Sequence, residues 1–502
     1  MRYGFVIDQN RCIGCHACTV ACKEEHQVPV GVFRTWVKYI EKGEFPHTRR
    51  HFGVMRCNHC DSAPCITICP TKALYRRSDG IVDFDNNRCI GCKSCMQACP
   101  YDALYIDPNS NTAAKCNFCA HRVEANLEPA CVIVCPTQAI IAGDLDDPGS
   151  KASRIVATEK VSVRKPHKGT EPKLYYKGIE GDLLEPTRLS RQSGYMFADQ
   201  HDNRAKEQSF DPTLTREVYD VGHPKPWGWK IAAYLWTKSI ATGVMLVAAI
   251  LMGFSTHARV PVLTIGAPLV SLGALGLTSL LLIFDLKRPD RFFYLLTKPN
   301  FRSWLVIGAW ILLAYGAAVL LWLLCGISGI AVPRVLLFIT AVLAIGSACY
   351  SAFLFAQAKG RDLWQSPLFI WHLLFHCLLA GGATLIIMAA FADDLRLAGY
   401  GFIALVNFLP WSLLFVLTEI MIPHATEDMR LAIRRLVRGD LSPQFWFMCI
   451  AVGLVFPILF IAGMIWTEFS PGLALLCAFL VLTGLWYFED LWVKAGQSVP
   501  LS

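Results

Sequence analysis

The second half of the chain is a series of long apolar runs separated by short polar segments. Each run reaches or approaches the roughly 20 residues that an α-helix needs to cross a bilayer. The pattern predicts an all-α membrane bundle of eight transmembrane helices, and the even number places both ends of this half on one side. The predicted spans are Ile231–Phe254, Val262–Phe284, Trp304–Leu324, Val335–Phe355, Leu368–Phe391, Gly399–Ile422, Phe445–Trp466 and Leu473–Phe488.

The first half has a different pattern, in which short β-type runs alternate with cysteine-rich loops. A hairpin-like insertion at Val32–Phe52 is expected to form a docking surface or a local core. This pattern predicts a small α+β domain with little apolar core. Its expected strands lie near Arg2–Ile7, Ile81–Phe84, Ala103–Ile106, Val161–Val163 and Lys173–Tyr176.

Between the two halves the chain is polar and rich in proline and glycine, without a sustained helical period, which favours a tether. Trp227 and Trp229 stand beside lysines at the end of this stretch, as is typical of a lipid–water boundary. The predicted division is a domain at 1–180, a tether at 181–228 and a membrane domain at 229–502.

Composition supports this division. Among 502 residues only 17% are charged and 54% are hydrophobic, which is too apolar for one soluble enzyme. The net charge of +8 is a mild basic excess, spread over both halves, and does not suggest a nucleic-acid partner. The N-terminal residues show no export signal, so we do not expect the first domain to be exported.

Loop charge predicts the orientation of the bundle, because cytoplasmic loops carry the excess of lysine and arginine. Twelve basic residues lie in loops on the side of the first domain, against three in the opposite loops. We therefore expect a multi-pass protein of the cytoplasmic membrane, with the first domain and both termini on the cytoplasmic side. The twelve are Lys287, Arg288, Arg291, Lys298, Arg302, Lys359, Arg361, Arg430, Arg434, Arg435, Arg438 and Lys494, and the three are Arg259, Arg334 and Arg396.

Sixteen cysteines of the first domain fall into four quartets. The run Cys-x2-Cys-x2-Cys-x3-Cys-Pro offers three thiolates to one cubic iron–sulfur cluster, while its fourth cysteine ligates a second cluster, so clusters come in pairs. Gly91 within the third quartet lets the backbone wrap closely around the metal. The quartets are Cys12, Cys15, Cys18, Cys22; Cys57, Cys60, Cys65, Cys69; Cys89, Cys92, Cys95, Cys99; and Cys116, Cys119, Cys131, Cys135.

Zinc and disulfide bonds are the alternatives for so many cysteines. Zinc ribbons use two separated Cys-x2-Cys pairs without the trailing x3-Cys-Pro that three quartets carry. A disulfide framework is typical of a short secreted chain, which this is not. Four [4Fe–4S] clusters are therefore expected, and removal of iron is expected to unfold the domain.

These quartets resemble the four-cluster electron-transfer subunit of the molybdopterin (dimethyl sulfoxide reductase) superfamily over about the first 180 residues. The resemblance implies a double ferredoxin-like fold, in which the first quartet pairs with the fourth and the second with the third. The implied ligand groups are Cys12, Cys15, Cys18 and Cys135; Cys22, Cys116, Cys119 and Cys131; Cys57, Cys60, Cys65 and Cys99; and Cys69, Cys89, Cys92 and Cys95.

The membrane half resembles the polysulfide-reductase (NrfD/PsrC) membrane subunits. The resemblance rests on YLWTKSIATG at 234–243, FDLKRPDRF at 284–292, SWLVIGAW at 303–310 and YSAFLFAQ at 350–357. It implies a pocket in which a membrane quinone, menaquinone or ubiquinone, exchanges electrons.

Polar groups inside lipid are costly and usually functional, which selects candidates for such a pocket. Tyr350 and Lys238 are expected to donate hydrogen bonds to the quinone, Asp285 and His376 to carry protons, and Gln357 to line the pocket with them. Two alternatives remain open: Lys238 snorkels to the interface, or Asp285 is only an ion-pair partner of a nearby arginine.

His372 and His376 lie one turn apart on one helix, so they cannot hold both faces of one haem, and no haem is expected. Glu419 in the sixth span either relays protons or fills a packed polar pair with a neighbouring helix.

The combined prediction is a subunit of a hetero-oligomeric quinone oxidoreductase. It relays electrons between a cytoplasmic catalytic subunit with a molybdenum or tungsten pterin and the quinone of the membrane lipid. The alternative is a membrane anchor or ion-translocating module that takes electrons from a soluble dehydrogenase or hydrogenase and has no quinone site of its own.

Overall fold

The computed structural model describes residues 1–43, 46–179, 184–191, 215–254 and 260–502. The chain forms two compact units, which are described separately. Unit 1 comprises Met1–Pro226 together with Pro500–Ser502, and unit 2 comprises Trp227–Val499.

The first sheet of unit 1 has four strands in the order β8-β1-β10-β9. Its centre is β1 (Tyr3–Asp8), which pairs antiparallel with β8 (Ile140–Asp144) and parallel with β10 (Leu174–Lys177). Helix α6 (Lys151–Thr158) packs on the sheet through Ala152 and Ile155. The strands expected near both ends of this domain are confirmed, with β9 at Val161–Ser162.

The second sheet has the order β11-β12-β2-β3. The predicted hairpin is present as β2 (Thr35–Lys42) and β3 (Arg49–Arg56). On the other edge of β2 lies β12 (Arg216–Tyr219), which comes from the stretch expected to be a tether. Residues 180–183 and 192–214 of that stretch lie outside the described residues.

The quartet cysteines lie on short helices and on the turns that flank them. Two small ribbons accompany these helices, one of β4 (Leu74–Arg76) and β5 (Val82–Phe84) and one of β6 (Leu104–Ile106) and β7 (Ala113–Lys115). The remaining elements of unit 1 are α1 (Ala17–His26), α2 (Pro64–Ile68), α3 (Ser94–Ala98), α4 (Ala120–Val123), α5 (Ala130–Ile133), η1 (Pro166–Lys168), η3 (Pro186–Arg188) and β11 (Ser190–Arg191).

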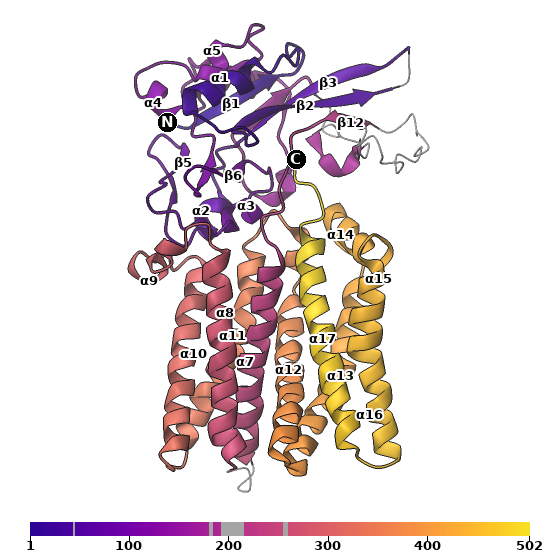
Figure 1. Ribbon diagram of the computed structural model, residues 1–502. Coiled ribbons are helices and arrows are strands. Elements are labelled where there is room, and N and C mark those ends of the chain that lie inside the picture. Colours follow the sequence, from indigo (N-terminus) through magenta and orange to yellow (C-terminus); the bar gives the residue numbers. More distant parts are fainter. Residues whose placement is uncertain (44–45, 180–183, 192–214, 255–259) are drawn as a thin grey trace. The chain divides into compact units, whose positions relative to one another are not determined.

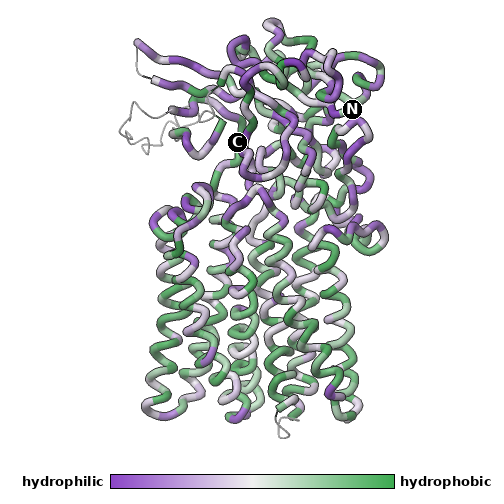
Figure 2. The backbone as a smooth tube through the Cα atoms, turned by 180° about the vertical axis from the view of Figure 1, so that it is seen from behind, coloured by the Kyte–Doolittle hydropathy of each residue, from purple (hydrophilic) through white to green (hydrophobic). Residues whose placement is uncertain are grey.

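Unit 2 contains eight helices that are long and apolar enough to cross a membrane, counted over its described residues, and this confirms the predicted bundle. Figure 2 shows the apolar character running along these helices. The spans are α7 (Trp229–Phe254), η4 with α8 (Val262–Asp285), α10 (Trp304–Ile327), α11 (Arg334–Ala356), α12 (Phe369–Ala392), α13 (Leu395–Met421), α15 to α16 (Ser442–Trp466) and α17 (Pro471–Gly496).

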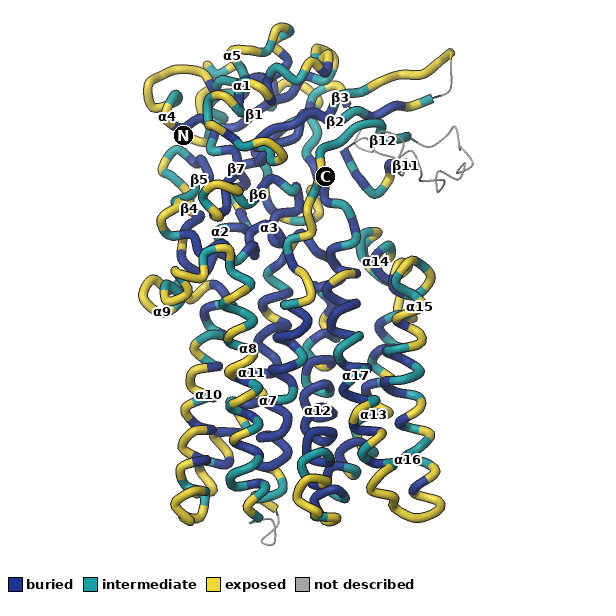
Figure 3. Tube along the Cα trace, in the orientation of Figure 1, coloured by how far each residue is buried: buried dark blue, intermediate teal, exposed yellow. Residues whose placement is uncertain are grey.

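Helices α7 and α12 are the most buried of the spans, as Figure 3 shows. They approach closely because glycines face each other where they cross. A Cβ atom added to Gly243 would lie 2.0 Å from the Cys377 carbonyl oxygen, and one added to Gly381 would lie 2.3 Å from the Gly243 carbonyl oxygen. Small residues at a crossing are how membrane helices pack without a hydrophobic driving force.

Short helices connect the spans. In α14 (Glu427–Arg438) the Thr426 side chain caps the N-terminus by accepting from the Met429 amide, and Ala432, Ile433 and Leu436 form the buried face. The other connecting elements are η5 (Pro289–Arg291), α9 (Tyr294–Thr297) and η6 (Asp362–Gln365).

Candidate functional sites

Each cysteine quartet begins with a left-handed turn. In the Cys-x2-Cys pair that opens each quartet the residue before the second cysteine has a positive φ: +68° at Gly14, +44° at His59, +67° at Gly91 and +62° at Phe118. Such a turn directs backbone N–H groups toward one point and so forms an anion-binding concavity. Glycine adopts this turn without strain at Gly14 and Gly91, whereas His59 and Phe118 adopt it at a cost of about 1–2 kcal/mol each.

The turns supply hydrogen bonds to sulfur. The amides of His59, Gly91 and Phe118 lie 3.4–3.5 Å from the Sγ atom of the cysteine two positions earlier. The Ala139 amide donates to Cys135 Sγ over 3.2 Å. Hydrogen bonds to the ligand sulfurs are one of the means by which a protein tunes an iron–sulfur cluster.

The structure brings together cysteines that are far apart in the sequence. Each implied ligand group contains cysteines that interact electrostatically in the structure, and cysteines of different groups do so as well, such as Cys18 with Cys131 and Cys95 with Cys65. The observed neighbours are Cys135 and Cys15 for Cys12; Cys116, Cys131 and Cys119 for Cys22; Cys99, Cys57 and Cys60 for Cys65; and Cys92, Cys89 and Cys69 for Cys95.

The cysteines fit iron–sulfur clusters in number and kind. Each implied ligand group offers four thiols, and four cysteine thiolates hold one [4Fe–4S] cluster.

Most of these thiols are buried, and burial makes them poor acids. Burial, with a smaller contribution from neighbouring thiols, raises the pKa of Cys18 to about 11 and that of Cys92 to about 12. At neutral pH these two thiols therefore keep their protons in the metal-free protein, and metal binding would release them.

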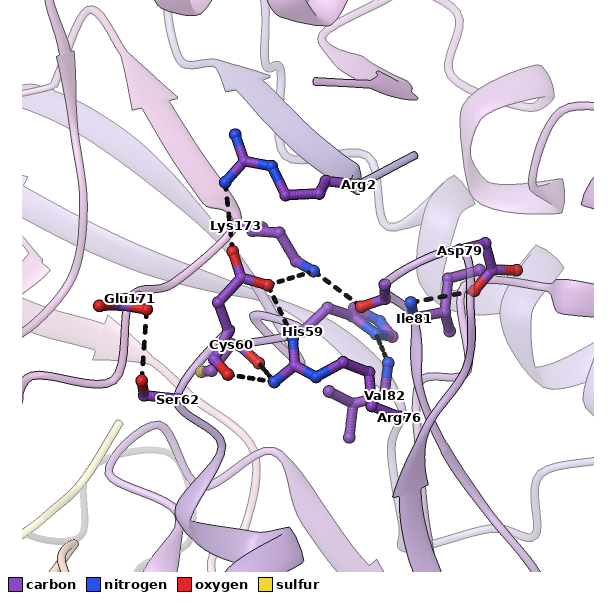
Figure 4. A network of polar contacts seen from close by, with 12 residues as sticks. Arg2, His59, Cys60, Ser62, Arg76, Asp79, Ile81, Val82, Glu171 and Lys173 are labelled. Atoms are coloured by element: carbon purple, nitrogen blue, oxygen red, sulfur yellow. Dashed lines mark hydrogen bonds and ion pairs between the residues drawn. The ribbon is translucent and has the colours of Figure 1, made fainter. Parts of the chain in front are cut away.

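Ion pairs fix the loop of the second quartet (Figure 4). The Asp61 carboxylate accepts from Lys173 Nζ at 2.9 Å, from Arg76 Nη1 at 2.7 Å and from Arg2 Nη1 at 3.3 Å. Arg76 also donates to the Cys60 carbonyl oxygen over 2.8 Å. These contacts tie the turn after Cys60 to the strands around it.

Lys238 and Tyr350 meet inside unit 2. Lys238 on α7 has no exposed surface, and its Nζ atom donates to the Ala348 carbonyl over 3.0 Å and to Ser351 Oγ over 2.5 Å. The same atom lies 4.7 Å from the centroid of the Tyr350 ring on α11. That ring packs against Gly308, where an added Cβ would come within 2.2 Å of it. Lys238 thus points into the bundle and does not reach its edge.

Asp285 and Gln357 have other surroundings. Asp285 is the last residue of α8 and is partly exposed. The Gln357 amide accepts from the Trp304 backbone N–H over 2.9 Å and donates to the Arg302 carbonyl over 2.7 Å. Both ends of this side chain therefore hold the start of α10.

His376 has a partner that the hydropathy pattern does not reveal. Its Nδ1 atom lies 2.9 Å from Glu489 Oε1, and both residues are 1% exposed. Glu489 escapes notice because the apolar run of the last span ends at Phe488, whereas α17 continues to Gly496. The apolar residues Leu491 and Trp492, which follow Glu489 and Asp490, would have indicated that the last helix continues.

A second polar pair lies one turn away on α12. His372 Nε2 is 3.8 Å from Glu419 Oε2, and Ser366 Oγ donates to the same oxygen over 2.8 Å. His372 and Glu419 are both buried. Of the two roles considered for Glu419, a packed polar pair with a neighbouring helix is therefore present, and it does not exclude proton transfer.

Comparison with known proteins identifies an iron–sulfur region and a membrane region in the chain. Residues 217–499 match the family model described as polysulphide reductase, NrfD, while residues 49–145 match a 4Fe-4S dicluster domain and residues 3–24 a 4Fe-4S binding domain.

Three curated proteins are similar to this chain over somewhat more than a third of its length. A tetrathionate reductase subunit of Salmonella typhimurium is 46% identical over 189 residues, which are 37% of this chain and 76% of that protein. A polysulfide reductase component of Wolinella succinogenes is 43% identical over 35% of this chain and 93% of its own length. The arsenate respiratory reductase iron-sulfur subunit of a Shewanella strain is 35% identical, over 35% and 96%.

Proposed function

Since this protein belongs to the NrfD polysulphide reductase family and carries a 4Fe-4S dicluster domain in the same polypeptide, we propose that it links a catalytic subunit to the membrane quinone pool. It is the electron-transfer and membrane-anchor subunit of a hetero-oligomeric oxidoreductase complex. Its sixteen quartet cysteines hold four [4Fe–4S] clusters, which supply single-electron transfer when bound.

The observation that carries the quinone step is the environment of Lys238. An ammonium group has three donors, and Ala348 and Ser351 take two of them. The described residues place no carboxylate in an ion pair with Lys238. One donor therefore remains for a substrate oxygen, and the centroid of the Tyr350 ring lies 4.7 Å from the same Nζ atom. Lys238 and Tyr350 donate hydrogen bonds to a quinone carbonyl and stabilise the negative charge that develops there on reduction.

Quinone reduction consumes two electrons and two protons. The buried pair of His376 and Glu489 can take up and release a proton, because an imidazole and a carboxylate at 2.9 Å share one hydrogen bond. Asp285, at the partly exposed end of α8, is a second proton carrier. In the reverse reaction the same groups accept the two protons of the quinol.

The catalytic partner is a separate subunit with a molybdenum or tungsten pterin. Support comes from the similar proteins, which are named as parts of tetrathionate, polysulfide and arsenate reductases. The charge asymmetry of the loops favours a cytoplasmic position for unit 1 and its partner. Purification of the native complex, identification of its largest subunit and a molybdenum and tungsten assay test this part.

The quinone step is tested with purified holoprotein whose clusters are reduced and then mixed with a ubiquinone or menaquinone analogue. We expect rapid reoxidation of the clusters. Lys238→Met and Tyr350→Phe should each slow it at least tenfold, and Tyr350→Phe removes only the hydroxyl because the ring still packs against Gly308. Tyr315→Phe is the matched control, because it removes a buried hydroxyl that bonds instead to Ser271 and to the Ala241 carbonyl. Reoxidation that is indifferent to quinone would favour the anchor or ion-translocating module.

A further inference from the structure

Arg56 is a fully buried cation that lies against the cysteine groups. It ends β3 directly before Cys57 and has no exposed surface. Its Nη1 atom donates to Cys131 Sγ over 3.1 Å, and its guanidinium lies 4.5 Å from the centroid of the Phe5 ring. Its Nε and Nη2 atoms have no hydrogen-bond partner among the described residues.

The charge of Arg56 is balanced by no carboxylate in the described part of the chain. Its strongest electrostatic partners are the thiols of Cys131, Cys116 and Cys18. A buried charge without a counter-ion costs several kcal/mol, and arginine does not lose its proton in proteins. A thiol becomes an anion when it coordinates a metal. The counter-ion of Arg56 is therefore a metal–thiolate group.

We propose that Arg56 raises the reduction potential of the cluster held by Cys22, Cys116, Cys119 and Cys131. The inference rests on the proposed four-cluster function. Reduction adds one electron to that cluster, with no bond formed or broken and no proton moved. The added negative charge appears next to a fixed positive charge in a water-poor interior, so the reduced form gains more stabilisation than the oxidised form. Charge and hydrogen bonds at the ligand sulfurs are recognised determinants of cluster potential.

Lys115 has the corresponding position at a different group. It is fully buried, and its Nζ atom lies 3.5 Å from Cys57 Sγ and donates to the Cys116 carbonyl over 2.8 Å and to the Val82 carbonyl. Cys57 belongs to the group with Cys60, Cys65 and Cys99. Lys115 therefore provides a comparison, because it is a second buried cation and the sulfur that its Nζ atom contacts belongs to another group.

The test is a mediated redox titration of the full-length holoprotein, with each reduced cluster followed by electron paramagnetic resonance. Arg56→Gln keeps a donor near Cys131 and removes the charge, whereas Arg56→Lys keeps the charge. We expect Arg56→Gln to lower one midpoint potential by at least a tenfold change in equilibrium constant, which is 59 mV for one electron. Arg56→Lys should restore at least half of that shift, and Lys115→Gln should lower a different midpoint.

Two results would overturn the proposal: unchanged midpoints in Arg56→Gln, or the same cluster shifted by both glutamine variants. Iron content is measured in parallel. If the wild-type protein holds far fewer than sixteen iron atoms, the four-cluster function fails and this inference with it. If sixteen are present and the midpoints do not move, only the inference fails.

A second measurement covers the case in which Arg56→Gln does not take up iron. Wild-type protein is labelled with nitrogen-15 in the arginine guanidinium groups, and the reduced clusters are studied by pulsed electron paramagnetic resonance. We expect a nitrogen coupling to one cluster, because Nη1 donates to a ligand sulfur, and its loss in Arg56→Lys. Absence of this coupling in the wild-type protein would contradict the proposal.

Discussion

His223 fastens the end of unit 1 by two ion pairs. Its Nδ1 atom lies 2.6 Å from Asp102 Oδ2, and its Nε2 atom lies 3.2 Å from Asp220 Oδ2. Close by, the fully buried Lys38 contacts Glu217 at 2.7 Å and Asp220 at 3.4 Å. These contacts hold β12 and the residues after it against β2 and against the loop that follows Cys99. We predict that this attachment weakens at alkaline pH.

The magnitude follows from the pKa of His223. Burial alone would lower this pKa, but hydrogen bonds with Asp102 and Asp220 raise it from 6.5 to about 9. A raised pKa stabilises the folded state fully below pH 6.5, and this stabilisation is lost as the pH rises through about 9. At about 1.36 kcal/mol per pKa unit the maximum is about 3.4 kcal/mol, of which about 2.5 remains at pH 7 and almost none at pH 10.

Hydrogen exchange of the β12 amides in the full-length protein measures this loss. After correction for intrinsic exchange rates, protection of residues 216–219 should fall roughly 70-fold between pH 7 and pH 10. In His223→Gln protection should be low at both pH values, whereas His47→Gln, at an exposed position between β2 and β3, should behave like the wild type. Equal protection of the wild-type amides at both pH values would refute the reasoning.

Three further predictions concern the rest of the chain. Gly243→Val should lower the melting temperature of unit 2 or prevent its folding, because the new side chain meets the α12 backbone; Gly253→Ala, where an added Cβ meets nothing within 4 Å, should not. Iron chelation should abolish hydrogen-exchange protection in unit 1 while the helices of unit 2 stay protected. In intact cells an impermeant maleimide should label Arg396→Cys, and Lys298→Cys only after lysis, if unit 1 is cytoplasmic.

The membrane helices could be predicted from the sequence, but the limits of the last one could not. Hydropathy detects side chains that lipid tolerates, so it places Glu489 and Asp490 beyond the span. In the structure α17 continues, and Glu489 is buried because His376 on α12 offers it a hydrogen-bond partner. A polar pair between two helices does not show in the hydropathy pattern of either helix, because each helix contributes only one polar residue to it.

Strand β12 was not predicted for a related reason. Arg216–Tyr219 is a short segment without clear alternation, and its partner β2 lies more than 170 residues earlier in the chain. The pairing is stabilised by two ion pairs. Lys38 is buried in β2, and its ammonium group pairs with the carboxylates of Glu217 and Asp220. The sequence contains all three residues but does not indicate that they meet.

At the cysteine turns the backbone conformation is the same in all four quartets, while the residue at the centre of the turn differs. Gly14 and Gly91 are small residues at the left-handed position, as the motif leads one to expect, but the other two quartets place His59 and Phe118 there. The His59 ring packs beside the stacked rings of Phe5 and Phe118, and its Nδ1 atom accepts from the Val82 amide. This packing offsets the backbone strain, so the side chains that glycine lacks become part of the core of unit 1. The turn is therefore fixed by the thiols it must present, and the residue at its centre varies with the space around it.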